Sequence, residues 1–197
     1  PTGYVRNASG TCVKDDPEPC DTGDPVIDDP DIQDAFGRLW EESNFGSLGN
    51  PNPESERVEQ GGWIVSDTST GIRSFKPFGS NWERSACQIK PPDDFTLPNN
   101  TVGVIHTHPY ATDEKMYACL QVPDNLIQQF KSKFDQVVKK YDNTPSSKDI
   151  TFINDIFDQT GASLNGYIID QSGIAKYQKN TDSDNSSTMT SHNRCGY

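Results

Sequence analysis

The sequence predicts an α/β domain in which helices flank a mixed β-sheet. Two observations support this class. Apolar residues recur at helical spacing in three separate segments, and short apolar runs bounded by glycines and turn residues lie between them. The 197-residue chain is long enough for one domain with appendages. We expect the domain over 31–179, an irregular leader or linker over 1–30 and a polar, mobile tail over 180–197.

The first half of the predicted domain contains one helix and two strands. The residues that share one helical face are Ile32, Phe36, Leu39 and Trp40. The segment 44–46 ends this helix. Strands are expected over 62–66 and 72–76, joined by a turn. The stretch 77–100 is rich in aromatic residues and prolines but has no clear period, so we expect a loop that walls a cleft.

The second half is predicted to contain a strand over 101–108, two helices and a hairpin. Seven apolar residues form a strong amphipathic pattern after the Pro-Asp pair at 123–124, and we expect its aromatic face to lie in the core. These residues are Leu126, Ile127, Phe130, Phe134, Val137, Val138 and Tyr141. A further helix is expected over about 149–159, followed by hairpin strands over 164–170 and 174–177.

Composition excludes some classes of partner. The net charge of −12 disfavours binding to nucleic acid, because a phosphate backbone requires a basic surface. No apolar run approaches the ~18 residues of a membrane helix. The five cysteines show no C-x-x-C spacing, and Cys12 and Cys20 are close enough in sequence to close a small disulfide loop. From this possible disulfide we expect a secreted or exported protein. Because the chain begins at Pro1, we also expect a fragment of a larger or processed protein.

The most informative motif is His106-Thr-His108, at the end of an apolar run. Residues two apart on a strand share a face, so both imidazoles point to one side and Thr107 to the other. Two convergent histidines supply two of the three protein ligands of a catalytic zinc. The alternative is a pair of ordinary surface or core histidines. The third histidine, His192, lies in the polar tail, where we expect it to be exposed.

Two further segments offer the remaining groups of a zinc hydrolase. Ser146 and Asp149 open a helical run, and Glu59 precedes the strand that starts at Gly61-Gly62. Asp149 can be the third ligand, Glu59 the general base and Ser146 the donor that stabilises the oxyanion. Structural explanations stay open as well. Ser146-x-x-Asp149 is also a helix capping box, and Glu59 is also a solvated charge at a strand end.

Together these motifs resemble the signature of the JAMM (MPN-type, JAB-like) zinc metallopeptidases. The matching residues are Glu59, then His106-Thr-His108-Pro109, then Ser146-x-x-Asp149. The resemblance covers about 59–177 and depends on the order of the motifs and on the proline. It implies a JAB/MPN-like layered domain whose mixed β-sheet is flanked by helices. The family's spacer between the second histidine and the aspartate is several-fold shorter than the 40 residues here (149 − 108 − 1), which implies a helical insertion over 109–144.

The resemblance implies one Zn²⁺ per chain, held by His106, His108 and Asp149. It implies hydrolysis of peptide, isopeptide or other amide bonds by zinc-activated water, with Glu59 as general base and Ser146 as oxyanion donor. The metal-free binding and scaffold members of the family normally lack one or more ligands, and all of them are present here. That alternative is therefore disfavoured.

A cysteine-dependent hydrolase that uses Cys87 or Cys119 is a second alternative, although neither residue has a recognisable nucleophile motif. The linker-like leader, the acidic charge and the terminal segment 194–197 are similar to JAB-like domains at the C-terminal ends of bacterial polymorphic toxins. That resemblance implies a cognate immunity protein as a partner.

Overall fold

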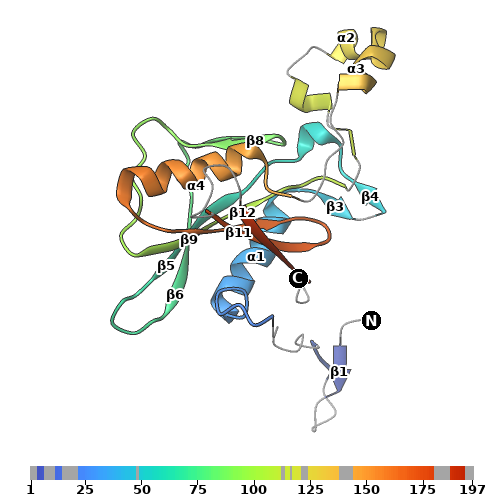
Figure 1. The fold of residues 1–197 in the computed structure, drawn as a ribbon. Coiled ribbons are helices and arrows are strands. Elements are labelled where there is room, and N and C mark those ends of the chain that lie inside the picture. Colours follow the sequence, from blue (N-terminus) through green and yellow to red (C-terminus); the bar gives the residue numbers. More distant parts are fainter. Residues whose placement is uncertain are drawn as a thin grey trace.

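Six strands form one mixed sheet at the centre of the fold, in the order β12-β11-β10-β9-β5-β6 (Figure 1). The computed structural model describes residues 4–6, 12–14, 22–47, 49–111, 114–115, 117–120, 124–137, 144–179 and 187–193. The strands of the sheet are β5 (Gly61–Ser66), β6 (Arg73–Pro77), β9 (Thr101–Thr107), β10 (Asn165–Ile169), β11 (Gly173–Lys179) and β12 (Ser187–Asn193). Strands β9 and β10 are parallel, and the other neighbours are antiparallel. The predicted α/β class with a mixed sheet is confirmed.

Two helices cover opposite faces of this sheet: α1 (Pro30–Glu42) and α4 (Ser147–Thr160). Successive side chains of a strand point to opposite faces, and the two core clusters follow this alternation. In β9, Val104 packs in the cluster that contains residues of α4, whereas Ile105 packs in the cluster that contains residues of α1. The layers therefore follow from the apolar runs of the sequence.

Local signals fix the ends of both helices. Asp29 caps α1 by accepting from the Asp31 N–H, and a proline opens the helix. Ser146 caps α4, and Gly161 ends it in the left-handed conformation, with φ of 70°. The predicted bounds of both helices are correct to within a few residues. Within the described ranges, no helix combines the length and the apolar character needed to cross a membrane.

Short hairpins occupy segments that the sequence predicts to be irregular. Strands β7 (Glu83–Ser85) and β8 (Gln88–Lys90) pair within the expected loop 77–100, so that expectation is wrong at this point. The other small elements are β1 (Tyr4–Arg6) with β2 (Cys12–Lys14), β3 (Gly46–Ser47) with β4 (Asn50–Pro51), and the 3₁₀ turns η1 (Glu54–Glu56) and η2 (Tyr117–Leu120). These strands are too short to show an alternating pattern in sequence.

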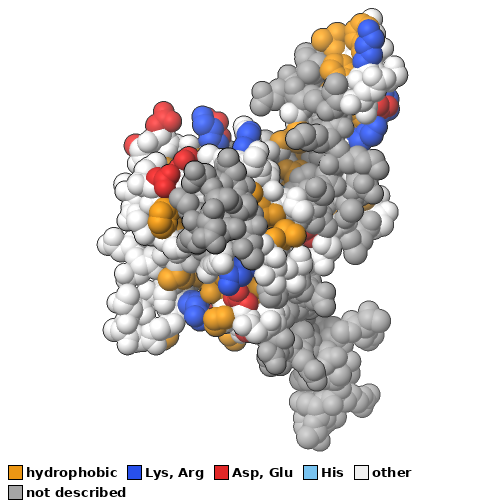
Figure 2. Space-filling view, in the orientation of Figure 1, with side chains coloured by type: hydrophobic (Ala, Val, Ile, Leu, Met, Phe, Trp, Pro, Cys, Tyr) orange, Lys and Arg blue, Asp and Glu red, His pale blue; other side chains and the backbone are white. Residues whose placement is uncertain are grey.

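In its described part, the segment 109–144, predicted to be a helical insertion, contains two short α-helices where one long helix was expected. Helices α2 (Asp124–Gln129) and α3 (Lys131–Val137) meet at Phe130 and stand away from the sheet (Figure 1). Ile127 is buried, but Leu126 and Phe130 are exposed, and hydrophobic side chains are visible at this end of the molecule (Figure 2). The expectation that the aromatic face lies in the core is therefore wrong at Phe130. The two faces of the sheet are already covered by α1 and α4.

Residues on both sides of the predicted domain, 31–179, also pack against it. Val26 and Ile27, expected in the leader, are buried in the core, and Asp24 forms an ion pair with Lys176 at 2.6 Å. The segment Ser187–Asn193, expected to be a mobile tail, forms edge strand β12 on β11. An edge strand needs only backbone hydrogen bonds, so its polar sequence gives no apolar signal. The proposed Cys12–Cys20 loop and the His192 side chain fall outside the described part of the chain.

Candidate metal centre

Strand β9 and the residue that follows it bring both histidines to the α4 side of the sheet. His106 lies two residues after Val104, so it shares the face on which Val104 packs, and Thr107 points to the other face. Beyond the strand end, the His108 N–H donates to the Ile169 carbonyl at 2.8 Å, which keeps the chain extended for one more residue. The predicted side-by-side placement of the two imidazoles is confirmed.

Position 61 of strand β5 has no room for a side chain, because β9 and Phe78 approach it closely. In the register of β5 with β9, Gly61 lies directly opposite His106. A Cβ atom at Gly61 would lie 2.6 Å from the Ile105 carbonyl oxygen and 2.7 Å from a ring carbon of Phe78. Any larger residue would therefore displace the strand or the neighbouring ring. The glycine that follows Glu59 in the sequence motif thus has a steric role beside the imidazole.

Three side chains converge at the end of β9. His106 Nε2 lies 3.0 Å from His108 Nε2 and 3.1 Å from Asp149 Oδ1, and His108 Nε2 lies 3.7 Å from Asp149 Oδ2. Metal–ligand bonds of about 2.0–2.2 Å at tetrahedral angles separate neighbouring ligand atoms by about 3.3 Å. The distances from His106 Nε2 to His108 Nε2 and to Asp149 Oδ1 are close to this value, and with one ligand atom per residue the whole group spans no more than 4.8 Å. His106, His108 and Asp149 therefore form a group that can hold a metal ion.

The helix cap and the ligand role are both present at Asp149. The Ser146 N–H donates to Asp149 Oδ2 at 2.7 Å, and the Asp149 N–H donates to Ser146 Oγ at 3.3 Å. This reciprocal pair is a capping box, as the structural explanation predicted. The cap fixes the carboxylate while Oδ1 still faces His106. The capping box therefore orients a carboxylate that could serve as a third ligand, and the two interpretations are compatible.

The surroundings of the three side chains favour a different protonation state for each of them. Burial and the neighbouring His106 charge lower the pKa of His108 to about 3, which keeps this imidazole neutral. Burial alone would raise the pKa of Asp149, but the adjacent imidazoles outweigh it and hold the pKa well below its usual range. Burial opposes protonation of His106, whereas the Asp149 carboxylate raises its pKa above the ordinary value. Without a metal ion, the group thus offers a carboxylate and a neutral imidazole, and a metal ion that binds His106 would displace its proton.

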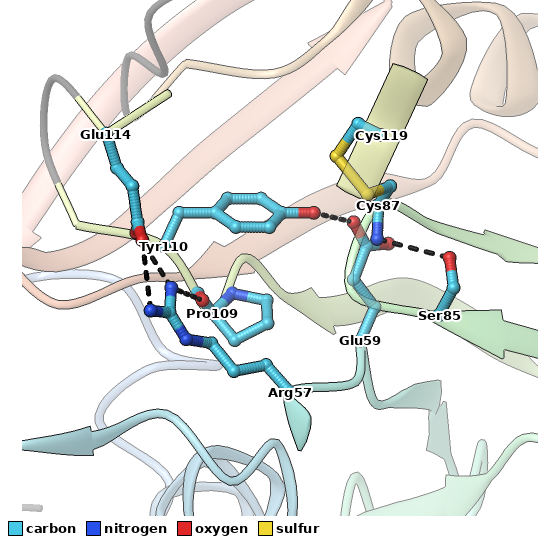
Figure 3. Close-up of a disulfide and its surroundings, with 8 residues drawn as sticks. All are labelled: Arg57, Glu59, Ser85, Cys87, Pro109, Tyr110, Glu114 and Cys119. Atoms are coloured by element: carbon cyan, nitrogen blue, oxygen red, sulfur yellow. Dashed lines mark hydrogen bonds and ion pairs between the residues drawn. A yellow bond between two sulfur atoms is a disulfide. The ribbon is translucent and has the colours of Figure 1, made fainter. Parts of the chain in front are cut away.

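Glu59 lies in a cavity of about 90 Å³ that also reaches His108, Ser146 and Asp149. Its side chain is buried, and the Tyr110 hydroxyl donates to Oε1 at 2.5 Å (Figure 3). Burial raises the pKa of Glu59 to about 8, although the His106 charge and the Tyr110 hydrogen bond lower it. The explanation of Glu59 as a solvated charge is therefore wrong. The structure brings all five predicted site residues to one place.

Sequence reasoning missed the contacts that hold this cavity together. Arg57 is buried and forms a bidentate ion pair with Glu114, at 2.7 and 2.9 Å, and it donates to the Pro109 carbonyl at 3.1 Å (Figure 3). These contacts tie the start of the insertion to the segment that carries Glu59. Tyr110, which holds Glu59, lies two residues after the second histidine, a position that gives no sequence signal by itself.

A disulfide between Cys87 and Cys119 adds a covalent link between the β7–β8 turn and η2. Because both sulfurs are bonded to each other, neither supplies a thiolate in the bridged form, so this form offers no support for the cysteine-hydrolase alternative. Cys87 lines the cavity of Glu59, so the bridge closes one wall of the site. A scan against protein-family models finds no match to this chain, and a search of curated proteins finds none either.

Proposed function

We propose that this chain is a zinc-dependent hydrolase of peptide or isopeptide amide bonds, of the JAMM type, with one Zn²⁺ per chain. The observation that carries the proposal is the convergence of His106, His108 and Asp149 beside the buried carboxyl of Glu59. Two imidazoles and one carboxylate leave a fourth position open, which is the ligand set of a catalytic rather than a structural zinc. The Glu59 carboxyl lies outside this ligand group and is free for proton transfer.

Each residue of the site has a separate task. Zinc, when bound, would supply a Lewis acid that polarises the amide carbonyl and lowers the pKa of water. Glu59 would accept a proton at Oε2, because Tyr110 holds Oε1, and would return it to the leaving amine. A dication nearby would lower the pKa of Glu59 from about 8, so the carboxyl would act as a base at neutral pH. Ser146 Oγ accepts from the backbone and keeps its own hydrogen for the oxyanion.

Metal analysis and one substitution test the proposal. Wild type should contain about one zinc per chain, and His106→Ala and Asp149→Ala should lose it. Glu59→Gln should keep zinc and fold but lose about two to four orders of magnitude in rate on peptide or isopeptide substrates. Glu56→Gln is the matched control, because this nearby glutamate is exposed and does not line the cavity of Glu59. A metal-free wild type purified without chelator, or a fully active Glu59→Gln, would refute the proposal.

Inhibitors separate this proposal from its alternatives. A chelator should abolish hydrolysis and a thiol alkylator should leave it unchanged, whereas a cysteine hydrolase would show the reverse. A scaffold module would bind its partner without turnover in either treatment. The Cys87–Cys119 bridge supports a secreted or exported protein, because disulfides persist in oxidising compartments. Delivery as a toxin domain, and an immunity protein as partner, stay predictions from the resemblance.

A further inference from the structure

A second, larger cavity adjoins the metal group on the side away from Glu59. It has a volume of about 410 Å³ and is lined by His106 and Asp149 at one end. The small cavity of Glu59 and this large cavity have several lining residues in common, among them Asp149, Ile89 and Lys148. The three ligands therefore lie at the junction of a small space that contains the base and a larger space on the other side.

The large cavity is mostly apolar and has rigid walls. The apolar residues that line it include Phe78, Trp82, Ile89, Val104, Phe152 and Tyr177. Phe78 and Trp82 stack in parallel with ring centroids 3.7 Å apart, and Trp63 contacts both rings edge-on from behind. Val104 and Tyr177 belong to the sheet and are buried in the core. The cavity is thus built into the fold between the sheet, α4 and the β7–β8 hairpin.

We propose that this cavity binds a large apolar side chain, aromatic residues included, on the substrate residue next to the hydrolysed amide. The inference rests on the proposed function and specifies its substrate class. A volume of about 410 Å³ lies at the low end of the range for small-molecule pockets, which suits one large side chain rather than an extended ligand. His106 and Asp149 in the wall place that side chain within one residue of the reacting bond.

Burial in this cavity should discriminate strongly between side chains. Full burial of a phenylalanine side chain should increase the binding affinity, compared with an alanine side chain, on the order of 10- to 100-fold. Besides Asp149 of the candidate metal group, the charged residues Lys90, Lys148 and Asp155 line the cavity. Lys148 is exposed and so can keep its charged end in water. A charged substrate side chain would lose hydration against the apolar part of the wall, and the Asp149 carboxylate is already paired with His106.

A pair of amides tests the pocket without any need for turnover. Metal-free and zinc-loaded protein are titrated with N-acetylphenylalanine amide and with N-acetylalanine amide, and binding is followed by tryptophan fluorescence, because Trp82 lines the cavity. We expect at least 10-fold tighter binding of the phenylalanine amide in both forms. Thr151→Phe, on the exposed surface of α4 at the cavity, should fill the space and remove this preference. Gln159→Phe, exposed on the same helix outside the cavity, should retain it.

Cleavage of a peptide mixture completes the experiment. Wild type and Gln159→Phe should cleave preferentially beside large apolar residues, and Thr151→Phe should lose this selectivity while its zinc content is unchanged. Hydrolysis without side-chain preference, or equal binding of both amides, would overturn the pocket proposal and leave the proposed function standing. A chain that binds the phenylalanine amide selectively but hydrolyses nothing would support the pocket and refute the proposed function.

Discussion

The buried carboxyl of Glu59 should make the metal-free protein lose stability as the pH rises. Its pKa in the folded protein is about 8, against 4.5 for an ordinary glutamate. Because the folded-state pKa is the higher one, the folded protein binds more protons than the unfolded chain between these two values. The stabilising contribution is therefore complete below about pH 4.5, decreases as the pH rises and is lost above about pH 8.

The size of this effect follows from the shift. Each pKa unit corresponds to about 1.4 kcal/mol, so a shift from 4.5 to about 8 corresponds to about 5 kcal/mol. That is comparable to the whole stability of a marginal domain. Glu59→Gln keeps the shape of the side chain and an acceptor for the Tyr110 hydroxyl but cannot ionise. The variant should therefore equal wild type at pH 4.5 and exceed it by up to about 5 kcal/mol above pH 8.

Urea unfolding of chelator-treated protein at several pH values measures this difference directly. The gap between Glu59→Gln and wild type should widen by about 1.4 kcal/mol per pH unit between pH 5 and 8. Glu56→Gln, at an exposed position, should run parallel to wild type throughout. Added zinc should narrow the gap, because a nearby dication favours the ionised carboxylate. Parallel profiles of wild type and Glu59→Gln over this range would refute the assignment of Glu59 as a buried, neutral acid in the metal-free state.

Two further predictions concern the contacts that hold the fold around the site. Replacement of both Cys87 and Cys119 by serine should lower the free energy of unfolding by about 3–4 kcal/mol, because the bridge closes a loop with a sequence separation of 32. The zinc content should be unchanged. Equal urea midpoints of wild type and the double variant would contradict the prediction. Asp24→Ala should lower the free energy of unfolding by about 2–4 kcal/mol, because it removes the acceptor of the Val26 and Ile27 N–H groups together with the Lys176 ion pair. Asp24→Asn keeps an acceptor and should lower it less. Equal decreases in the two variants, measured by urea unfolding, would show that the ion pair accounts for the whole effect.

The parts of the fold that sequence reasoning predicted correctly are those specified locally. Ser146 and Gly161 bound α4 because an N-cap and a left-handed C-cap each depend on only a few neighbouring residues. The placement of His106 and His108 on one side follows from the period of a strand, which no distant contact can change without a bulge. The location of Glu59 near this pair came from the resemblance, and the antiparallel register of β5 with β9 explains it.

The parts that were missed depend on pairings between distant segments. Arg57 and Glu114 are 57 residues apart, and neither has a neighbour that marks it as buried. The partner of Cys87 was one of several cysteines, and spacing alone cannot choose among them. Strand β12 forms because the edge of β11 offers unpaired backbone groups, which a polar sequence can satisfy as well as an apolar one. Phe130 fits an amphipathic stripe but has no free sheet face to cover.

The residues of the candidate metal group meet although a long segment, the predicted insertion, separates His108 from Asp149 in sequence. The entropy of loop closure grows only with the logarithm of length, about 0.6 kcal/mol for each doubling, so the 40 residues add little cost over a short loop. Each ligand is fixed by its own element: His106 by the β-sheet and Asp149 by the cap of α4. The insertion is in turn attached near its start by the Arg57–Glu114 ion pair and further along by the Cys87–Cys119 bridge. The geometry of the site therefore depends on the elements at either end of the insertion and not on its length.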